Sequence, residues 1–327
     1  MPLSRREPTV TSNDMTEDDM TEDVPGGTGT LAGHRVARIG FGVMQLAEHR
    51  PGRPAVSPDM AVAMLRKAVD AGVNHLDTAA FYGTVTGGTT ATATANDLIR
   101  IALHPYPGEL VLATKVGAER DATGVLVPAQ RPEQLRAGVE ANLSRLATEQ
   151  LAVVYLRRLD APPGILAEGD QRVDLDSQLA ELMALRDEGK IEGIGLSNVS
   201  ADQLRQALPA GIVGVQNSHS PVDRAGEPVL DLCREQDIAW IPFCPLGSAF
   251  PAWPKVADQP AVRTAAETLG VTPVEVALAW HLAHYSRTLL IAGTADPAHL
   301  AENLTAGAVR LDAGMLAAID AITVATP

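Results

Sequence analysis

The sequence predicts an α/β protein, a (β/α)8 barrel with an N-terminal β-hairpin cap. Eight strand-like apolar runs alternate with helix-like stretches between residues 38 and 291. Aromatic residues make up only 3% of the 327 residues, and an aliphatic core is typical of parallel strands covered by helices. A doubly wound sheet is the alternative, but its Gly-x-Gly-x-x-Gly turn is absent after the first strand. We therefore predict a TIM barrel.

Turn, cap and periodicity signals predict the individual elements. Residues 30–36 indicate a hairpin that leads into the first barrel strand. Ser57 and Pro58 are typical of a helix start, with Ser as the N-cap and Pro in the first turn. Capping-box patterns begin at Ser200 and Thr272. Further helices are expected at 132–147, 174–188 and 273–284. The eight strands are expected at 38–42, 73–76, 110–113, 152–156, 191–196, 212–215, 238–243 and 288–291.

The first 27 residues differ from the rest in being polar and strongly acidic. The pentapeptide DMTED at residues 14–18 repeats directly at residues 19–23. A segment with so little apolar surface cannot stabilise a fold of its own, so we predict a disordered tail over residues 1–27. Met15 and Met20 are alternative start positions. Residues 28–327 are expected to form a single domain.

Composition excludes several classes of partner. A net charge of −14 argues against a nucleic-acid partner. The two cysteines lack the spacing of a disulfide framework or a zinc site. No apolar run approaches the ~20 residues needed to cross a bilayer, and no signal peptide is visible. We expect a cytoplasmic protein that binds a small molecule, and the oligomeric state stays open.

Polar residues cluster where the predicted strands end. That end of a barrel is where active sites form. The residues at or just beyond strand ends are Asp77, Lys115, Arg157, Ser197, Asn198, Gln216 and Asn217.

Asp77, Tyr82 and Lys115 together indicate a proton-donating unit. A tyrosine is a poor acid at its ordinary pKa of about 10. A neighbouring ammonium stabilises the phenolate and lowers that pKa, and a carboxylate keeps the lysine charged. Each residue taken singly is as easily an ordinary ion-pair or loop residue, so the inference depends on all three meeting.

From Thr28 to Ile322 the chain resembles the aldo-keto reductase family. Asp77-Thr-x-x-x-Tyr82-Gly and Thr114-Lys115 match its catalytic segments. Residues 195–198, 215–217 and 242–248 resemble the segments around the nicotinamide and pyrophosphate, and residues 293–303 the segment at the adenosine end. The resemblance implies cofactor contacts from Met44, Asp77, Ser197, Asn198, Gln216, Phe243, Cys244, Pro245, Leu246, Gly247, Ser248, Gly293, Thr294, His299, Glu302 and Asn303.

The same resemblance implies reduction of a small carbonyl substrate, an aldehyde or ketone. Hydride passes from the nicotinamide to the carbonyl carbon, and Tyr82 acts as general acid, its pKa lowered by Lys115 paired with Asp77. Most members have His where Arg157 stands. Arg stabilises an alkoxide but cannot relay a proton. The alternative is that Arg157 is a structural ion-pair residue, equivalent to Arg158.

Arg157 also narrows the subgroup. Together with residues 42–46, 102–106, 114–117, 153–157 and 242–246, it makes the chain similar to bacterial pyridoxal reductase-like members. That likeness implies NADPH-dependent reduction of pyridoxal to pyridoxine. Two alternatives stay open: a pathway-specific carbonyl or imine reductase of secondary metabolism, and a cofactor-binding regulatory barrel with little catalysis.

NADPH is favoured over NADH, although two expected cations are missing. Gly293 and His299 stand where many relatives place Lys and Arg against the 2′-phosphate. The amides of the helix that begins at Asp296-Pro297 are available to an anion. Residues 83–95 after Tyr82 are either a wall of the substrate pocket or a permissive insertion.

The remaining histidines receive simpler interpretations. We predict His75 to be a packed, hydrogen-bonded core residue. His219 either lines the pocket or packs. His281 and His284 are three residues apart on one helix, but no acidic partner is evident, so we predict no metal site.

Overall fold

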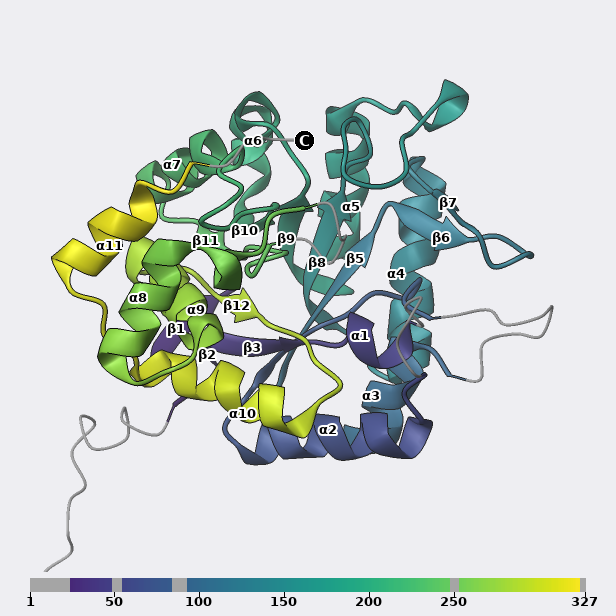
Figure 1. Cartoon of the computed structure of the whole chain (residues 1–327). Coiled ribbons are helices and arrows are strands. Elements are labelled where there is room, and N and C mark those ends of the chain that lie inside the picture. Colours follow the sequence, from purple (N-terminus) through teal and green to yellow (C-terminus); the bar gives the residue numbers. More distant parts are fainter. Residues whose placement is uncertain (1–23, 49–54, 84–92, 248–252, 324–327) are drawn as a thin grey trace, which may run out of the picture.

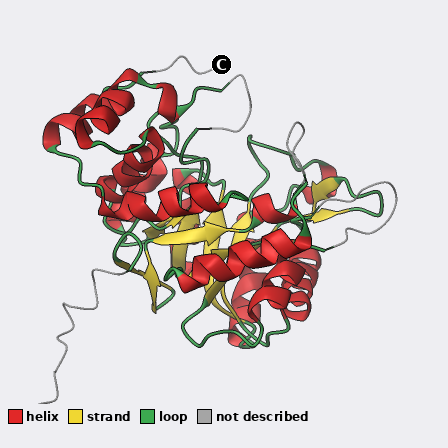
Figure 2. Cartoon of the chain, turned by 60° about the horizontal axis from the view of Figure 1, so that its bottom comes forward, coloured by secondary structure: helices red, strands yellow, loops and turns green. Residues whose placement is uncertain are grey.

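A ring of parallel strands forms the centre of the molecule, with helices around it (Figures 1 and 2). The computed structural model describes residues 24–48, 55–83, 93–247 and 253–323. Its eight-stranded sheet has the order β11-β10-β9-β8-β5-β4-β3-β12. A parallel bridge between Trp240 and Thr288 joins the two ends, since the Leu289 amide donates to the Trp240 carbonyl at 2.8 Å. The predicted barrel is confirmed.

The strands lie where the apolar runs predict them, with ends that differ by a few residues. Two short antiparallel pairs accompany the barrel strands. The barrel strands are β3 (Ile39–Gly42), β4 (His75–Asp77), β5 (Val111–Val116), β8 (Leu151–Arg157), β9 (Ile191–Ser197), β10 (Ile212–Gln216), β11 (Ala239–Trp240) and β12 (Leu290–Ile291). The antiparallel pairs are β1 (Thr28–Leu31) with β2 (His34–Ala37), and β6 (Ala118–Arg120) with β7 (Leu126–Pro128).

Helices connect the strands, and side-chain caps fix where several of them begin. Ser57 caps the helix that starts at Pro58, and both predicted capping boxes, at Ser200 and Thr272, are confirmed. The helices are α1 (Met44–Ala47), α2 (Pro58–Asp70), α3 (Ala95–Leu103), α4 (Pro132–Leu146), α5 (Leu175–Asp187), α6 (Ala201–Ala207), α7 (Glu227–Glu235), α8 (Pro260–Leu269), α9 (Pro273–His284), α10 (Pro297–Thr305) and α11 (Ala313–Asp320). No helix in the described ranges is both long and apolar enough to cross a membrane.

The N-terminal hairpin closes one end of the barrel, as predicted. Leu31 and Val36 are buried and pack with Val111, Val153 and Ala239, which lie toward the amino ends of their strands. The hairpin therefore excludes water from the floor of the barrel. The opposite end, where the strands finish, is left for the site.

One expectation about strand length is wrong, and one strand pairing was not predicted. The expected strand over 238–243 is only two residues long, because Pro242 has no N–H for a ladder and Cys244 has a left-handed φ of 55°. The β6–β7 pair follows β5 directly and has no sequence prediction. Residues 1–23, Ser248 and most of the 83–95 stretch lie outside the described residues.

Candidate functional site

Strand register brings the predicted catalytic residues to one end of the barrel. Asp77 is the last residue of β4 and pairs with Ala113 of β5, two residues before Lys115. Lys115 pairs with Tyr155 of β8, two residues before Arg157. Each of these residues thus lies two positions further along its strand than the residue on the strand before it, an offset that keeps all three side chains on the same face of the sheet. The prediction that these residues share the C-terminal mouth is confirmed.

A buried ion pair lies at the centre of the site. The Lys115 ammonium contacts Asp77 Oδ1, and the two side chains are only 7% and 4% exposed. The Gln216 amide nitrogen donates to the other carboxylate oxygen at 2.6 Å. Burial alone would lower the pKa of Lys115, but Asp77 and Tyr82 raise it above its ordinary value. Lys115 is therefore a fixed cation.

Tyr82 lies over this cation in the loop after β4. Its ring centre is 5.2 Å from the Lys115 ammonium, and its ring packs edge-on against Phe81. Burial raises the pKa of Tyr82, and the charges of Lys115 and Arg157 oppose that rise without cancelling it. Lys115 lowers the pKa of Tyr82, as expected, but desolvation of the phenolate is the larger effect, so the pKa lies above its ordinary value. Tyr82 is therefore protonated at neutral pH.

A series of hydrogen bonds among buried polar side chains holds the loop that carries Tyr82. The Thr78 hydroxyl donates to Asn96 Oδ1 at 2.8 Å, and Asn96 Nδ2 donates to Asn142 Oδ1 at 2.8 Å. The Thr114 hydroxyl donates to the same Asn142 oxygen at 2.6 Å. These bonds tie β4 and β5 to α3 and α4 on both sides of the ion pair. The sequence did not lead us to predict these hydrogen bonds, although two asparagines inside helices were a signal for them.

The two adjacent arginines, Arg157 and Arg158, have different surroundings. Arg158 is buried, forms an ion pair with Asp160 and donates to the carbonyl of Val173. Arg157 is only half-buried and has no ion pair with any residue in the described ranges. A Cβ on Gly164, whose φ is 102°, would lie 2.8 Å from the Arg157 guanidinium, so this glycine makes room for it. The ion-pair role falls to Arg158, and Arg157 keeps its charge at the mouth.

The residues expected at the nicotinamide differ in which of their side-chain atoms are already hydrogen-bonded within the protein. Ser197 ends β9, and Asn198 follows it with a φ of 59°. The Asn198 amide nitrogen is already used, because it donates to the carbonyls of Arg158 and Ala161. Gln216 is fully buried, its nitrogen is held by Asp77, and its Oε1 has no partner among the described residues. Only the oxygens of these two amides are available to a carboxamide.

The segment after β11 bends over the mouth. Phe243 is half-buried, and its amide donates to the Asn217 carbonyl at 3.0 Å. Cys244 is exposed, Pro245 and Leu246 are half-buried, and Gly247 has a φ of 82°. His281 of α9 lies within hydrogen-bonding distance of the Pro245 carbonyl and anchors the segment.

The segment after β12 approaches the end of β3 very closely. A Cβ on Gly293 would lie 2.1 Å from the Gly42 carbonyl oxygen, so no side chain fits there. The Gln45 amide donates to the Gly293 carbonyl at 2.7 Å, a contact that the sequence did not indicate. The other residues expected at the adenosine end lie nearby in sequence: Thr294 and Asn303 are buried, Glu302 is half-buried and His299 is exposed.

His75 and His219 are both buried, which confirms the predicted packing of His75 and one of the two alternatives for His219. Neither ring nitrogen of His75 has a hydrogen-bond partner in the described structure, so the expected hydrogen bond is wrong. Burial lowers the pKa of His75 to about 4, and the ring is neutral at pH 7. His219 is 1% exposed between Trp240 and Trp280, which excludes the alternative that it lines the pocket.

Comparison with known proteins agrees with this geometry. The family model described as "Aldo/keto reductase family" matches residues 38–324. This chain belongs to the aldo/keto reductase family and is an NAD(P)H-dependent oxidoreductase. A thermostable aldo-keto reductase solved with the inhibitor epalrestat has a TM-score of 0.70 at 22% identity, covering 90% of this chain and 98% of that one. The aldose reductase of Giardia lamblia has a TM-score of 0.69 at 19% identity, covering 87% and 91%.

Curated relatives show closer likeness in sequence. The pyridoxine 4-dehydrogenase of Escherichia coli K12 is 36% identical over 297 residues, which is 90% of this chain and 98% of that protein. An uncharacterized oxidoreductase of Schizosaccharomyces pombe is 31% identical over 288 residues, covering 87% and 86%. A probable aldo-keto reductase of Glycine max is 30% identical over 309 residues, covering 85% and 83%.

Because the buried His75 ring is neutral, we expect the free energy of unfolding to decrease at acidic pH. The unfolded chain binds a proton at this ring below its ordinary pKa of 6.5, whereas the folded chain does so only below about 4. Stability from this group is complete above pH 6.5 and falls with the pH between these values, by about 3 kcal/mol in all. His75→Leu removes the titrating ring without breaking a hydrogen bond. Urea unfolding at several pH values should show a shallower loss for the variant; identical slopes would contradict this.

Proposed function

We propose that this enzyme reduces an aldehyde with Tyr82 as the general acid and Arg157 as the group that stabilises the developing alkoxide. The observation that carries the proposal is the placement of a protonated phenol over a fixed buried cation, beside an arginine that forms no ion pair within the described part of the chain. A carbonyl oxygen between Tyr82 and Arg157 would meet one proton donor and one permanent charge.

Each residue of the site has its own role in the proposed reaction. A bound nicotinamide cofactor supplies the hydride. As negative charge grows on the substrate oxygen, Tyr82 donates its proton, because an alkoxide is a much stronger base than a phenolate. Lys115 stabilises the phenolate that remains, and Asp77 holds Lys115 in place. Arg157 offers fixed donors to the oxygen at no cost in reorganisation.

The described residues fit a nicotinamide cofactor. Gln216 presents a buried oxygen without a partner, which suits the N–H of a carboxamide. Phe243 is half-buried at the mouth and leaves part of its ring for stacking. Gly293 and Gly42 are in backbone contact at the ends of β3 and β12, so neither position places a side chain where the cofactor would pass.

We favour NADPH over NADH, with an unusual arrangement at the 2′-phosphate. The backbone contact at Gly293 excludes a lysine there. The phosphate contacts would come from the side chains of Thr294 and His299 and from the His299 amide in the first turn of α10, because Pro297 has no N–H and the Ala298 amide already donates to Asp296 at 2.8 Å. These contacts are weaker than a lysine–arginine clamp, so a measurable residual activity with NADH is expected.

Pyridoxal is the proposed substrate. The support is the Escherichia coli relative, called pyridoxine 4-dehydrogenase, at 36% identity over nearly its whole length. Arg157 adds to this support, because a planar cation beside the site suits a polar aromatic aldehyde better than an aliphatic one. Reduction of the aldehyde to pyridoxine is the expected direction with NADPH in excess.

Tyr82→Phe tests the proposed acid. Removing the phenol hydroxyl should lower kcat by about a hundredfold or more, since proton transfer is lost, while NADPH affinity measured by fluorescence stays unchanged. Tyr106→Phe is the matched control, because the Tyr106 hydroxyl only donates to the Leu146 carbonyl in the outer layer. Unchanged turnover in Tyr82→Phe would refute the role.

The two arginines should respond in opposite ways. Arg157→Met removes a charge without breaking an ion pair, so Tm should hold while kcat falls by about a hundredfold. Arg158→Met removes the ion-pair partner of Asp160, which keeps a bond from Gln203, and the donor to Gln178 Oε1, so Tm should fall. Thermal unfolding and steady-state kinetics on both variants separate the roles. A wild-type kcat in Arg157→Met would contradict catalysis by this residue.

Kinetics with a panel of substrates and both cofactors test the proposed substrate and the preference for NADPH. NADPH oxidation with pyridoxal should give the highest kcat/KM among aldehydes, ketones and cyclic imines, and NADH should be less efficient. Activity with other aldehydes but none with pyridoxal would remove the substrate proposal and leave the carbonyl chemistry intact. A clear preference for NADH would overturn the cofactor choice.

A further inference from the structure

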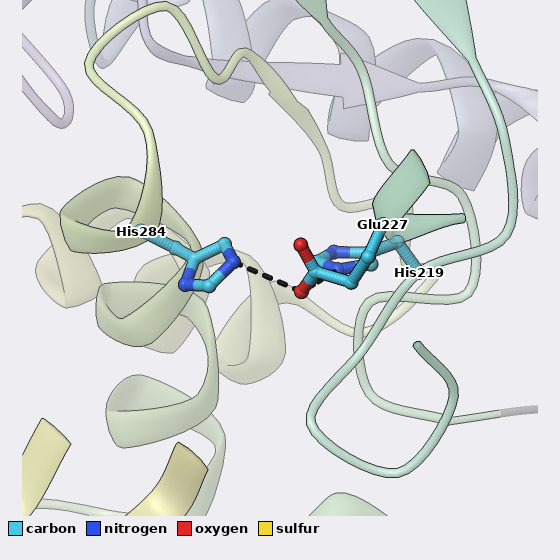
Figure 3. A group of neighbouring side chains, drawn as sticks. All are labelled: His219, Glu227 and His284. Carbon is cyan, nitrogen blue, oxygen red and sulfur yellow. Dashed lines mark hydrogen bonds and ion pairs between the residues drawn. The ribbon is translucent and has the colours of Figure 1, made fainter. Parts of the chain in front are cut away.

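A second cluster of ionisable side chains lies apart from the catalytic residues. His219 follows β10, Glu227 begins α7 and His284 ends α9, and their side chains point toward one another (Figure 3). His219 Nε2 is 3.1 Å from Glu227 Oε1, and His284 Nε2 is 3.0 Å from the same oxygen. The three atoms all lie within 4.8 Å of one another. The acidic partner that the sequence did not reveal for His284 thus comes from another helix.

Aromatic rings hold both imidazoles in place. His219 is fixed between Trp240, which meets it edge-on, and Trp280, which stacks on it with ring centres 5.5 Å apart. His284 stacks on Trp280 at 4.4 Å. Neither ring can turn away without losing this packing, so the two nitrogen atoms are oriented before any ligand binds. Such preorganisation is what a metal site needs from the protein.

The surrounding charges leave the carboxylate available. Arg234 is paired with Asp231 at 2.7 Å and lies 3.8 Å from Glu227. Arg224 is paired with Asp320 at 2.7 Å. Each arginine therefore has its own acidic partner. Glu227 makes its close contacts with the two imidazoles, and a divalent cation there would meet one negative charge and two neutral nitrogens.

We propose that His219, Glu227 and His284 bind one Zn²⁺ ion. Two imidazole nitrogens and one carboxylate oxygen are a common zinc ligand set. Bonds of about 2.0 Å place tetrahedral ligand atoms about 3.3 Å apart, close to the 3.1 Å and 3.0 Å between Glu227 Oε1 and the two imidazole nitrogens. The side chains of Glu227 and His284 are 24% and 18% exposed, so water can supply the fourth ligand. Both imidazoles then carry their proton on Nδ1.

The ion would fasten three elements behind the cofactor-covering segment. The His219 amide donates to the Phe243 carbonyl at 3.3 Å, and His281, next to this cluster, holds the Pro245 carbonyl. A metal that fixes His219 therefore fixes the backbone on which Phe243 is carried. Its role is structural, because the cluster contains none of the proposed catalytic residues.

Zinc titration of the untagged, chelator-treated protein tests the proposal. Isothermal titration with Zn²⁺ alone should give one site per chain and a rise in Tm. His284→Gln and Glu227→Gln should each weaken binding by more than about tenfold, since even outer partners of a metal are worth that much. Both residues are partly exposed, so the variants are expected to fold, which far-ultraviolet circular dichroism checks.

His34→Gln is the matched control, because His34 also contacts a glutamate, Glu192, but on the surface and without a second imidazole in the described cluster. It should bind Zn²⁺ as the parent does. Absence of a one-to-one site in the parent, or equal affinity in all three variants, would overturn the proposal and leave the cluster as a hydrogen-bonded clamp between α7 and α9.

Discussion

The buried ion pair between Asp77 and Lys115 is the interaction on which the rest of the site depends. Taking two charges out of water costs several kcal/mol each, and only close contact and further hydrogen bonds offset this. The Gln216 amide and the Thr78 carbonyl provide such bonds. Because loss of either partner leaves a buried charge alone, β4, β5 and β10 have to keep their relative positions. A closed barrel enforces that.

Inside the barrel, large rings that pack against glycines support the Asp77–Lys115 ion pair. The His75 ring lies against Gly40, where a Cβ would be 2.4 Å from Nδ1. The Tyr155 ring lies against Gly195, where a Cβ would be 2.2 Å from Cδ1. These glycines cost some strand stability, yet they admit the rings that fill the space below the ion pair. The buried ion pair of Lys115 and Asp77 therefore lies above closely packed rings.

Much of this arrangement could be predicted from the residues themselves. Apolar runs with cap signals predicted eight strands and their helices, and the Asp77, Tyr82 and Lys115 motif predicted the centre of the site. The direction of the Tyr82 pKa shift could not be predicted, because it is the balance between burial and the charges of Lys115, Asp77 and Arg157. The Asp77–Gln216 bond and the Glu227 contacts were also out of reach, since they join residues far apart in the chain.

The sequence by itself determined the family, the barrel and the placement of the predicted site residues at strand ends, because periodicity and motif spacing are local properties of the chain. Only the tertiary structure decided which of Arg157 and Arg158 forms an ion pair, that Gly293 excludes a lysine, and that three distant side chains meet at Glu227. These outcomes depend on strand register, burial and contact distance, which arise only when separate segments pack together.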